Sequence, residues 1–182
     1  MAKRPDITEL AKEIKDPMLS DSFVLTFPKL PAGLGADISK RLMLHCQQAT
    51  KPGMTINPVE VQLFGHTLEY AGNNTFSHDM SVTFIENRDG NIQAILEKWA
   101  IHCRHPTTQI GAYKEGADGY AAKAELEIFD QTGKSVKTYH IFGCWPSSVP
   151  EVSFDGSNSS LITLACTFKF DTYGNTDQQV PA

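Results

Sequence analysis

Apolar and polar residues alternate with a period of two along most of the chain, a pattern typical of half-buried β-strands. The runs lie at residues 22–27, 41–49, 57–65, 80–86, 120–130, 135–143 and 161–171, and a short strand followed by a turn is expected within 149–160. Segments rich in Gly, Pro or polar residues separate them at 29–37, 71–79 and 106–119, and we interpret these as loops. The pattern predicts about seven or eight strands in a mainly antiparallel sandwich or barrel.

The alternation also indicates which side chains share a face. In the run at 41–49 the shared face carries Leu42, Leu44 and Cys46, and in the run at 80–86 it carries Met80, Val82 and Phe84. The eleven-residue run at the end places Ile162, Leu164, Cys166, Phe168 and Phe170 on one face. The turn signal DQTG lies between the runs at 120–130 and 135–143, which predicts a hairpin.

Two segments show helical spacing instead. The clearer one carries a single apolar stripe of Ile92, Ile95, Leu96, Trp99 and Cys103. We expect this helix to be capped by Asp89 or Asn91, to end before Pro106 and to pack on the sheet. A short amphipathic helix is predicted at 6–15, where Pro17 stops it.

Composition narrows the class of protein. With 182 residues, 41% hydrophobic and 20% charged, residues 1–182 suit one folded domain, with an N-terminal extension at 1–20 and a polar tail at 174–182. The net charge is −5 and Lys and Arg never cluster beyond two residues, which disfavours tight nucleic-acid binding. The chain has no apolar run long enough to span a bilayer, and residues 1–16 lack the apolar core of a secretory signal.

Candidate chemistry is sparse. The four cysteines, which are Cys46, Cys103, Cys144 and Cys166, form no CxxC pair and are interpreted as structural, although a disulfide between subunits stays open. His45 and Cys46 would point to opposite faces of a strand, and Pro106 ends the helix too close to the HCRH sequence at 102–105 for a rigid metal pair. The sequence contains no nucleophile elbow and no phosphate-binding fingerprint. We therefore expect no catalytic residue, metal or cofactor.

Three ordered stretches resemble the tail tube protein family of contractile-tailed bacteriophages. They are CQQATKP at 46–52, the segment from Ala71 to Trp99, and the segment from Gly143 to Tyr173. The positions that carry the resemblance are Cys46, Pro52, Ala71, Gly72, Thr75, Phe76, Val82, Trp99, Gly143, Trp145, Pro146, Asp155 and Asn158. Residues 1–20, the tail after Tyr173 and the loop at 106–119 have no counterpart in the family pattern.

The resemblance implies a structural virion protein rather than an enzyme. It implies homo-hexameric rings that stack into the inner tube of a contractile tail, where each subunit lends strands to a shared barrel. DNA would pass through the lumen without specific binding, and the partners would be further copies of the chain and the sheath, tape measure, baseplate and tail terminator proteins. Such a protein is assembled in the cytoplasm of the host bacterium, ends in the virion and does not enter a membrane.

Exposed loops are the expected contact surfaces. Candidates for contacts between rings or with the sheath are Leu30, Leu34, Asp37, Tyr113 and Lys114. The main alternative is a ring protein of a phage-like bacteriocin or of a contractile secretion system. A ligand-binding barrel of lipocalin type and a Cys/His hydrolase also stay open.

Overall fold

The computed structural model describes residues 6–7, 9, 13, 18–35, 37–152, 154–157 and 159–175. The helix predicted at 6–15 and the tail predicted at 174–182 lie largely outside the described residues, and so does Asn158. Those predictions remain predictions.

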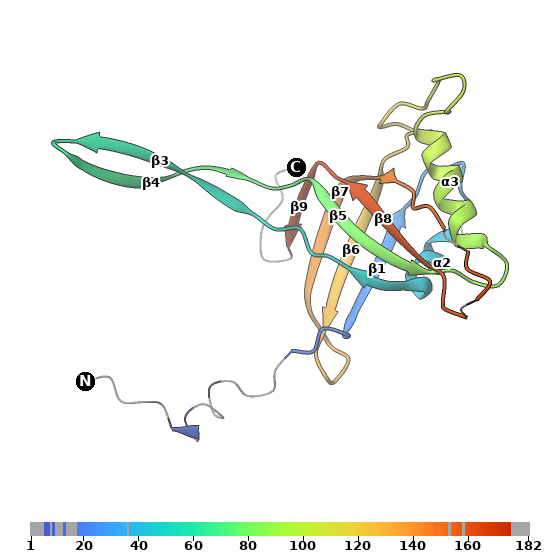
Figure 1. Cartoon of the computed structure of the whole chain (residues 1–182), viewed down its shortest axis with the longest axis horizontal. Helices are drawn as coiled ribbons and strands as arrows, with labels where there is room; N and C mark the ends of the chain where they lie inside the picture. The colour runs from blue at the N-terminus through green and yellow to red at the C-terminus, as the bar shows by residue number, and fades with distance from the viewer. Residues whose placement is uncertain are drawn as a thin grey trace.

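The described part of the chain forms nine strands and two helices, which confirms a mainly antiparallel β fold. The strands are β1 (Phe23–Lys29), β2 (Cys46–Ala49), β3 (Thr55–Leu63), β4 (His66–Thr75), β5 (Asp79–Ile85), β6 (Ala122–Phe129), β7 (Ser135–Ser148), β8 (Thr163–Lys169) and β9 (Thr172–Asn175). The helices are α2 (Ile38–His45) and α3 (Asn91–Cys103). Seven strands make one sheet in the order β1-β6-β7-β8-β5-β2, with β9 paired to β7, while β3 and β4 pair only with each other (Figure 1).

The long strand β7 joins two halves of the sheet. Its first part pairs with β6 and β9, and its last part, from Trp145 to Ser148, pairs with β8. Gly143 lies at this junction with φ +68°, and a side chain there would clash with the carboxylate of Asp171. Gly143 thus provides the bend that folds one half of the sheet over the other.

The core fills the space between the two halves and below α3. The predicted stripe of α3 is confirmed, because Ile92, Leu96 and Trp99 are fully buried. The ring centroid of Trp99 lies 5.8 Å from that of Phe27 on β1 and 5.6 Å from that of Phe168 on β8. Its indole N–H donates to the carbonyl oxygen of Tyr120 at 2.9 Å. Trp99 therefore ties the helix to both halves of the sheet.

The start of α3 differs from the prediction. Neither Asp89 nor Asn91 is the N-cap, which is Gly90 in the left-handed region with φ +65°. The carboxylate of Glu86 accepts hydrogen bonds from the backbone N–H groups of Ile92 at 3.0 Å and Gln93 at 2.7 Å. A residue upstream of the turn satisfies these amides, so the local capping pattern pointed to the wrong residues.

Replacing Glu86 with alanine should lower the free energy of unfolding by about 1–2 kcal/mol, the typical cost of losing a helix cap. The Asp89→Ala variant is the matched control and should be close to neutral, since its side chain bonds to none of these amides. Urea denaturation followed by circular dichroism compares the two variants. A larger loss for Asp89→Ala than for Glu86→Ala would contradict this account of the cap.

Three predicted elements are wrong. Residues 41–45 belong to α2 rather than to a strand, because Ile38 and Leu42 lie one helical turn apart on the packed side while Leu44 is 68% exposed. Most of the predicted loop at 71–79 belongs to β4. Among the described residues of 149–160 there is no strand. The last strand is confirmed but shorter, and β9 follows where a tail was expected.

Candidate assembly surface

The hairpin of β3 and β4 is the most unusual feature of the molecule. It projects from the body as a twisted two-stranded ribbon, which we call the arm (residues 55–75; Figure 1). Its register runs from Thr55 opposite Thr75 to Leu63 opposite His66. Nearly every arm residue is exposed in the single chain.

The arm has one apolar and one polar face. Directly paired residues share a face, so one face carries Val59, Val61, Leu63, Leu68 and Tyr70. The other face carries Glu60, Gln62, Thr67 and Glu69. On the apolar face, Leu63 is 54% and Tyr70 56% exposed. An isolated two-stranded hairpin is marginally stable in water, and an exposed apolar strip usually marks an interaction site.

The tip of the arm is a tight turn with an aromatic side chain. The turn consists of Phe64 and Gly65, both with positive φ, at 50° and 80°. Such turns favour Asn, Asp or Gly, so an aromatic residue here costs backbone energy. Phe64 is nevertheless 98% exposed in the single chain.

Several family positions lie at the base of the arm. The strand register shifts between Ile56 and Pro58, and Gly72 sits opposite this shift. A Cβ at Gly72 would lie 2.6 Å from the carbonyl oxygen of Asn57, so only glycine fits without rearrangement. Ala71 pairs with Pro58, and the Thr75 hydroxyl donates to the Thr55 carbonyl at 3.4 Å. This irregular pairing sets the direction in which the arm leaves the body.

An aromatic cluster follows the arm on the body. The ring of Phe76 stacks on Phe170 with centroids 5.9 Å apart, and it meets Tyr173 edge-on at 5.6 Å. The imidazole of His78 lies 4.3 Å from Phe76 by ring centroids. The cluster fixes the end of β4 to β9 and to the residue that follows β8.

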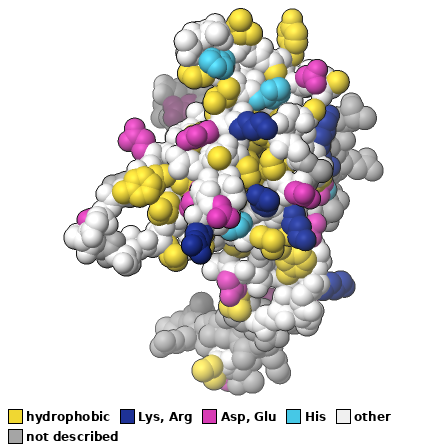
Figure 2. Space-filling model, turned by 90° about the vertical axis from the view of Figure 1, so that its right-hand side faces the viewer, with side chains coloured by type: hydrophobic (Ala, Val, Ile, Leu, Met, Phe, Trp, Pro, Cys, Tyr) yellow, Lys and Arg dark blue, Asp and Glu magenta, His cyan; other side chains and the backbone are white. Residues whose placement is uncertain are grey.

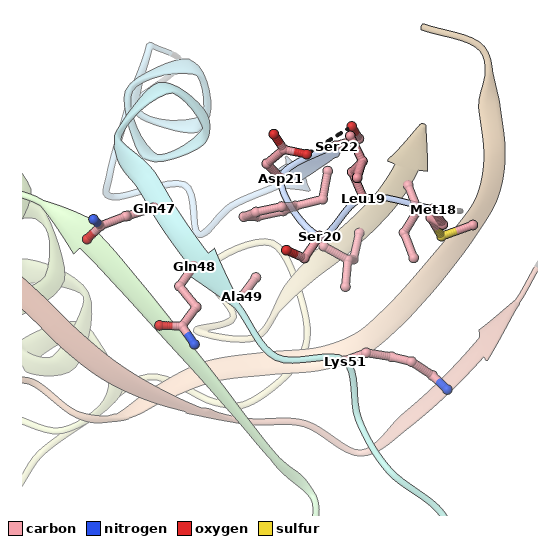
Figure 3. A pocket seen from close by; sticks show the side chains of 12 residues that line it. Met18, Leu19, Ser20, Asp21, Ser22, Gln47, Gln48, Ala49 and Lys51 are labelled. Atoms are coloured by element: carbon pink, nitrogen blue, oxygen red, sulfur yellow. Dashed lines mark hydrogen bonds between the residues drawn. The ribbon is translucent and has the colours of Figure 1, made fainter. Parts of the chain in front are cut away.

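An open cavity lies between the two outer strands of the sheet. It measures about 760 Å³ and opens between the start of β1 and the end of β2; we call it the edge cavity. It is lined by residues 18–23, Gln47, Gln48, Ala49, Lys51, Leu126 and Ile128. Figure 3 shows Met18, Leu19 and Ser20 on one side of the opening and Gln48, Ala49 and Lys51 on the other. Two of the lining residues, Leu126 and Ile128, lie on β6, and Ile128 pairs with Phe23 at the start of β1.

Most of the other positions that carry the family resemblance are buried, packed against an aromatic ring or hydrogen-bonded. Cys46 begins β2, Pro52 and Val82 are buried, and Trp145 meets Tyr120 edge-on at 5.9 Å between centroids. Pro146 is buried opposite Phe168, next to a register shift of β7. The Asp155 carboxylate accepts bonds from the Ser157 amide at 2.9 Å and hydroxyl at 2.6 Å, which lowers the pKa of Asp155. These contacts favour a structural reading of the three stretches.

The thiols are poorly suited to nucleophilic chemistry. All four cysteines are free, and burial raises the pKa of Cys46 and Cys103 to about 11 and that of Cys166 to about 12. A protonated thiol is a weak nucleophile. The Nδ1 atom of His45 forms a hydrogen bond with the carbonyl oxygen of Ile85 at 2.9 Å. In the described part of the chain, no three His, Cys, Asp or Glu side chains gather as a metal site.

The five loop residues predicted to contact other rings or the sheath differ in how exposed they are. Leu34 is only 5% exposed and packs in the core of the single chain, and its role in contacts between subunits stays a prediction. Leu30 packs at the edge of the core. Asp37 is exposed at the start of α2, Tyr113 is 88% exposed, and Lys114 forms an ion pair with Asp171. Contacts through the other four residues also remain a prediction.

The face that carries α3 shows no dominant charge. Figure 2 views the molecule from this side, and cationic and anionic side chains are interspersed across it. Within the described residues, no helix combines the length and apolar character needed to cross a bilayer.

Comparison with known proteins agrees with this picture. The model of a family described as phage tail tube protein matches residues 18–176. The cryo-EM structure of the anti-feeding prophage tube-terminating cap aligns with a TM-score of 0.62 and 11% identity, over 89% of this chain and 92% of that chain. A sheath–tube complex of the PVC extracellular contractile injection system aligns with a TM-score of 0.58 and 11% identity, over 95% and 99%. Comparison with curated protein sequences gives no match.

Proposed function

This chain belongs to the phage tail tube protein family, and we propose that it assembles into stacked hexameric rings that form the inner tube of a contractile phage tail. In this role the tube conducts DNA and its outer wall templates the sheath. The family supports a structural role in a tube, and the protein acts as an assembly rather than as an enzyme.

The observation that carries the proposal is the exposed apolar face of the arm. Fully burying a Val or Leu side chain contributes roughly 1.5–3 kcal/mol relative to leaving it in water. The arm extends away from its own body, so its apolar face has to be covered by another chain (Figure 1). A repeating subunit offers such a surface in every copy.

The outer strands of the sheet support the same proposal. In the described residues, β1 and β2 end the sheet, and each has one edge without a strand partner. Unpaired edges favour pairing with another chain, and a barrel shared by several chains removes them. Contacts between unlike surfaces close into a ring when the rotation divides a circle, and the rings can then stack. A six-fold baseplate of the anti-feeding prophage contains a chain of this fold, which supports six copies per ring.

DNA passage and the tail partners belong to the same proposal. A net charge of −5 gives phosphates few counter-charges, which suits passage without binding. Contacts with sheath, tape measure, baseplate and tail terminator proteins are expected at the ring surfaces. Aligned chains of this fold occur in complexes described as sheath–tube, baseplate, and sheath/tube terminator.

Purified full-length protein should form rings or tubes that negative-stain electron microscopy detects, with six subunits around the ring. Sedimentation velocity should show species much larger than the 20.1 kDa chain. Dilution and raised salt serve as controls for nonspecific aggregation, which yields no regular diameter. A stable monomer at millimolar concentration would contradict the proposed function.

A second candidate is the tube of an extracellular contractile injection system, favoured by the anti-feeding prophage and PVC structures that share the fold. The two roles differ in the particle that contains the tube. Mass spectrometry of particles purified from the producing bacterium would find the chain with capsid proteins and DNA in the first case. In the second case it would find the chain in headless particles.

A further inference from the structure

We infer that the tip of the arm, centred on Phe64, inserts into the edge cavity of a second copy of this chain. This inference rests on the proposed function and deepens it, because it assigns the receiving surface. Such a contact needs a projecting apolar group on one copy and an apolar cavity that accepts it on another copy.

The projecting group is Phe64. Its ring is almost fully exposed, and it occupies a turn position with positive φ at which a small polar residue would be less strained. Strain at an exposed position is usually compensated elsewhere, here by burial of the ring on docking. The flanking pair of Leu63 and His66 would widen the contact.

The receiving site is the edge cavity. Its volume of about 760 Å³ far exceeds one aromatic side chain, so it also has room for the turn around Phe64. Its apolar lining includes Phe23, Leu126 and Ile128. An aromatic ring inserted here would fill the cavity that the described residues of the single chain leave open.

The tip cannot reach the cavity of its own chain. The two strands of the arm are paired along their length, and the turn lies at the end remote from the body (Figure 1). A tip on one copy and a cavity on another form a contact between unlike surfaces, which repeats from copy to copy.

Charge complementarity favours the same pairing. Glu60 and Glu69 are directly opposite each other in the arm, which destabilises a hairpin unless a cation is near. Among the described residues neither has an ion-pair partner, and the same holds for Lys51 at the rim of the edge cavity. Three residue steps separate the acidic pair from the Leu63–His66 pair, which is about 10 Å along a strand. With the tip inserted, the acidic pair would reach the rim on the side of Lys51.

Lys51 is already oriented at this rim. Its ammonium group lies 5.1 Å from the centre of the Tyr139 ring, and Lys137 lies 5.6 Å from the same ring. Both cations lack a carboxylate partner in the described part of the chain. Asp21 also lines the cavity and accepts a hydrogen bond from the Ser22 hydroxyl at 3.3 Å, so an incoming acidic pair should prefer the side of Lys51.

Photo-crosslinking within assembled tubes tests the inference. Benzoylphenylalanine replaces Phe64 in the full-length chain, and tubes are formed from equal amounts of isotope-labelled and unlabelled protein. Mass spectrometry should find cross-links between light and heavy chains at residues 18–23, 47–51 or 126–128. Cross-links between chains at any other surface, or none in tubes that form, would overturn the inference while leaving the proposed function intact.

A second variant covers the case in which the change at position 64 prevents assembly. Benzoylphenylalanine at Gln48 should then cross-link to residues 62–66 of another copy, and cross-links elsewhere would overturn the inference. The Lys51→Glu variant should weaken assembly at least tenfold, and adding Glu60→Lys with Glu69→Lys should restore it. Absence of that rescue would contradict the charge pairing. If the unmodified chain forms no tubes, both the proposed function and this inference are wrong.

Discussion

Replacing Val59, Val61 and Leu68 with serine is expected to abolish tube formation while the body of the protein stays folded. The three side chains lie on the apolar face of the arm, where Val59 is 51% and Leu68 47% exposed in the single chain and Val61 is half-buried. Because they are already about half buried, covering the rest should contribute about 1 kcal/mol each, so the protein concentration needed for assembly should rise by about 100-fold or more. Sedimentation velocity and electron microscopy measure this change.

The polar face of the arm provides the matched control. Replacing Gln62 and Thr67 with serine alters the same two strands at the same distance from the tip but removes no apolar side chain. This variant should assemble at close to the normal concentration. Circular dichroism of both variants should show that the body is unchanged. If the apolar variant forms normal tubes, the arm is not the main assembly contact.

Replacing Trp99 with alanine should lower the free energy of unfolding by about 3–5 kcal/mol, the usual cost of removing a large buried aromatic side chain. The indole is fully buried, contacts Phe27 and Phe168, and donates to Tyr120. The substitution leaves a cavity between the two halves of the sheet and an unsatisfied carbonyl. Chemical denaturation in the assembly-deficient arm variant would measure the loss without a contribution from subunit contacts.

The control for Trp99 lies two residues further along the same helix. Ile101 is 46% exposed, so Ile101→Ala removes an apolar side chain of α3 without opening the core. Its effect should be below about 1 kcal/mol, because much of its surface already meets water. Equal losses at the two positions would show that α3 does not pack as described.

The sequence predicted well the elements that are buried within one chain. The strand with Met80, Val82 and Phe84 and the stripe around Trp99 follow clean periods because one of their faces meets the core. The predicted hairpin of β6 and β7 is confirmed for the same reason, with Ala124 and Leu126 buried. In each case the partner surface belongs to the same molecule.

The failures have identifiable causes. Leu42 and Leu44 are two residues apart, as on one face of a strand, but only Leu42 is buried. Ile38 and Leu42 lie one helical turn apart, and this spacing is the one that the structure uses. A short apolar run does not distinguish a strand from one face of a helix. In β4 only Leu68 and Tyr70 alternate before the Ala-Gly-Asn-Asn segment, which resembles a loop. Its structure depends on pairing with β3, a long-range contact that local pattern does not reveal.

The candidate surface was predicted only in part. Cys46, Gly72, Trp99 and Gly143 identified the family, yet most of the family positions shape the fold, and Gly72 sets the base of the arm. The apolar face of the arm was missed because its strands have no buried side in a lone chain. A signal was present in Val59, Val61 and Leu63, whose alternation was assigned to an ordinary core strand.

The shape of the arm affects how a polymer of this chain would grow. A paired ribbon without a supporting layer is only marginally stable, and holding it in one conformation costs entropy. That cost is offset when a neighbouring surface already exists, and it is uncompensated when two free chains meet. Starting a new tube should therefore be slower than extending one, so tubes of the purified protein should grow after a lag that preformed tube fragments shorten.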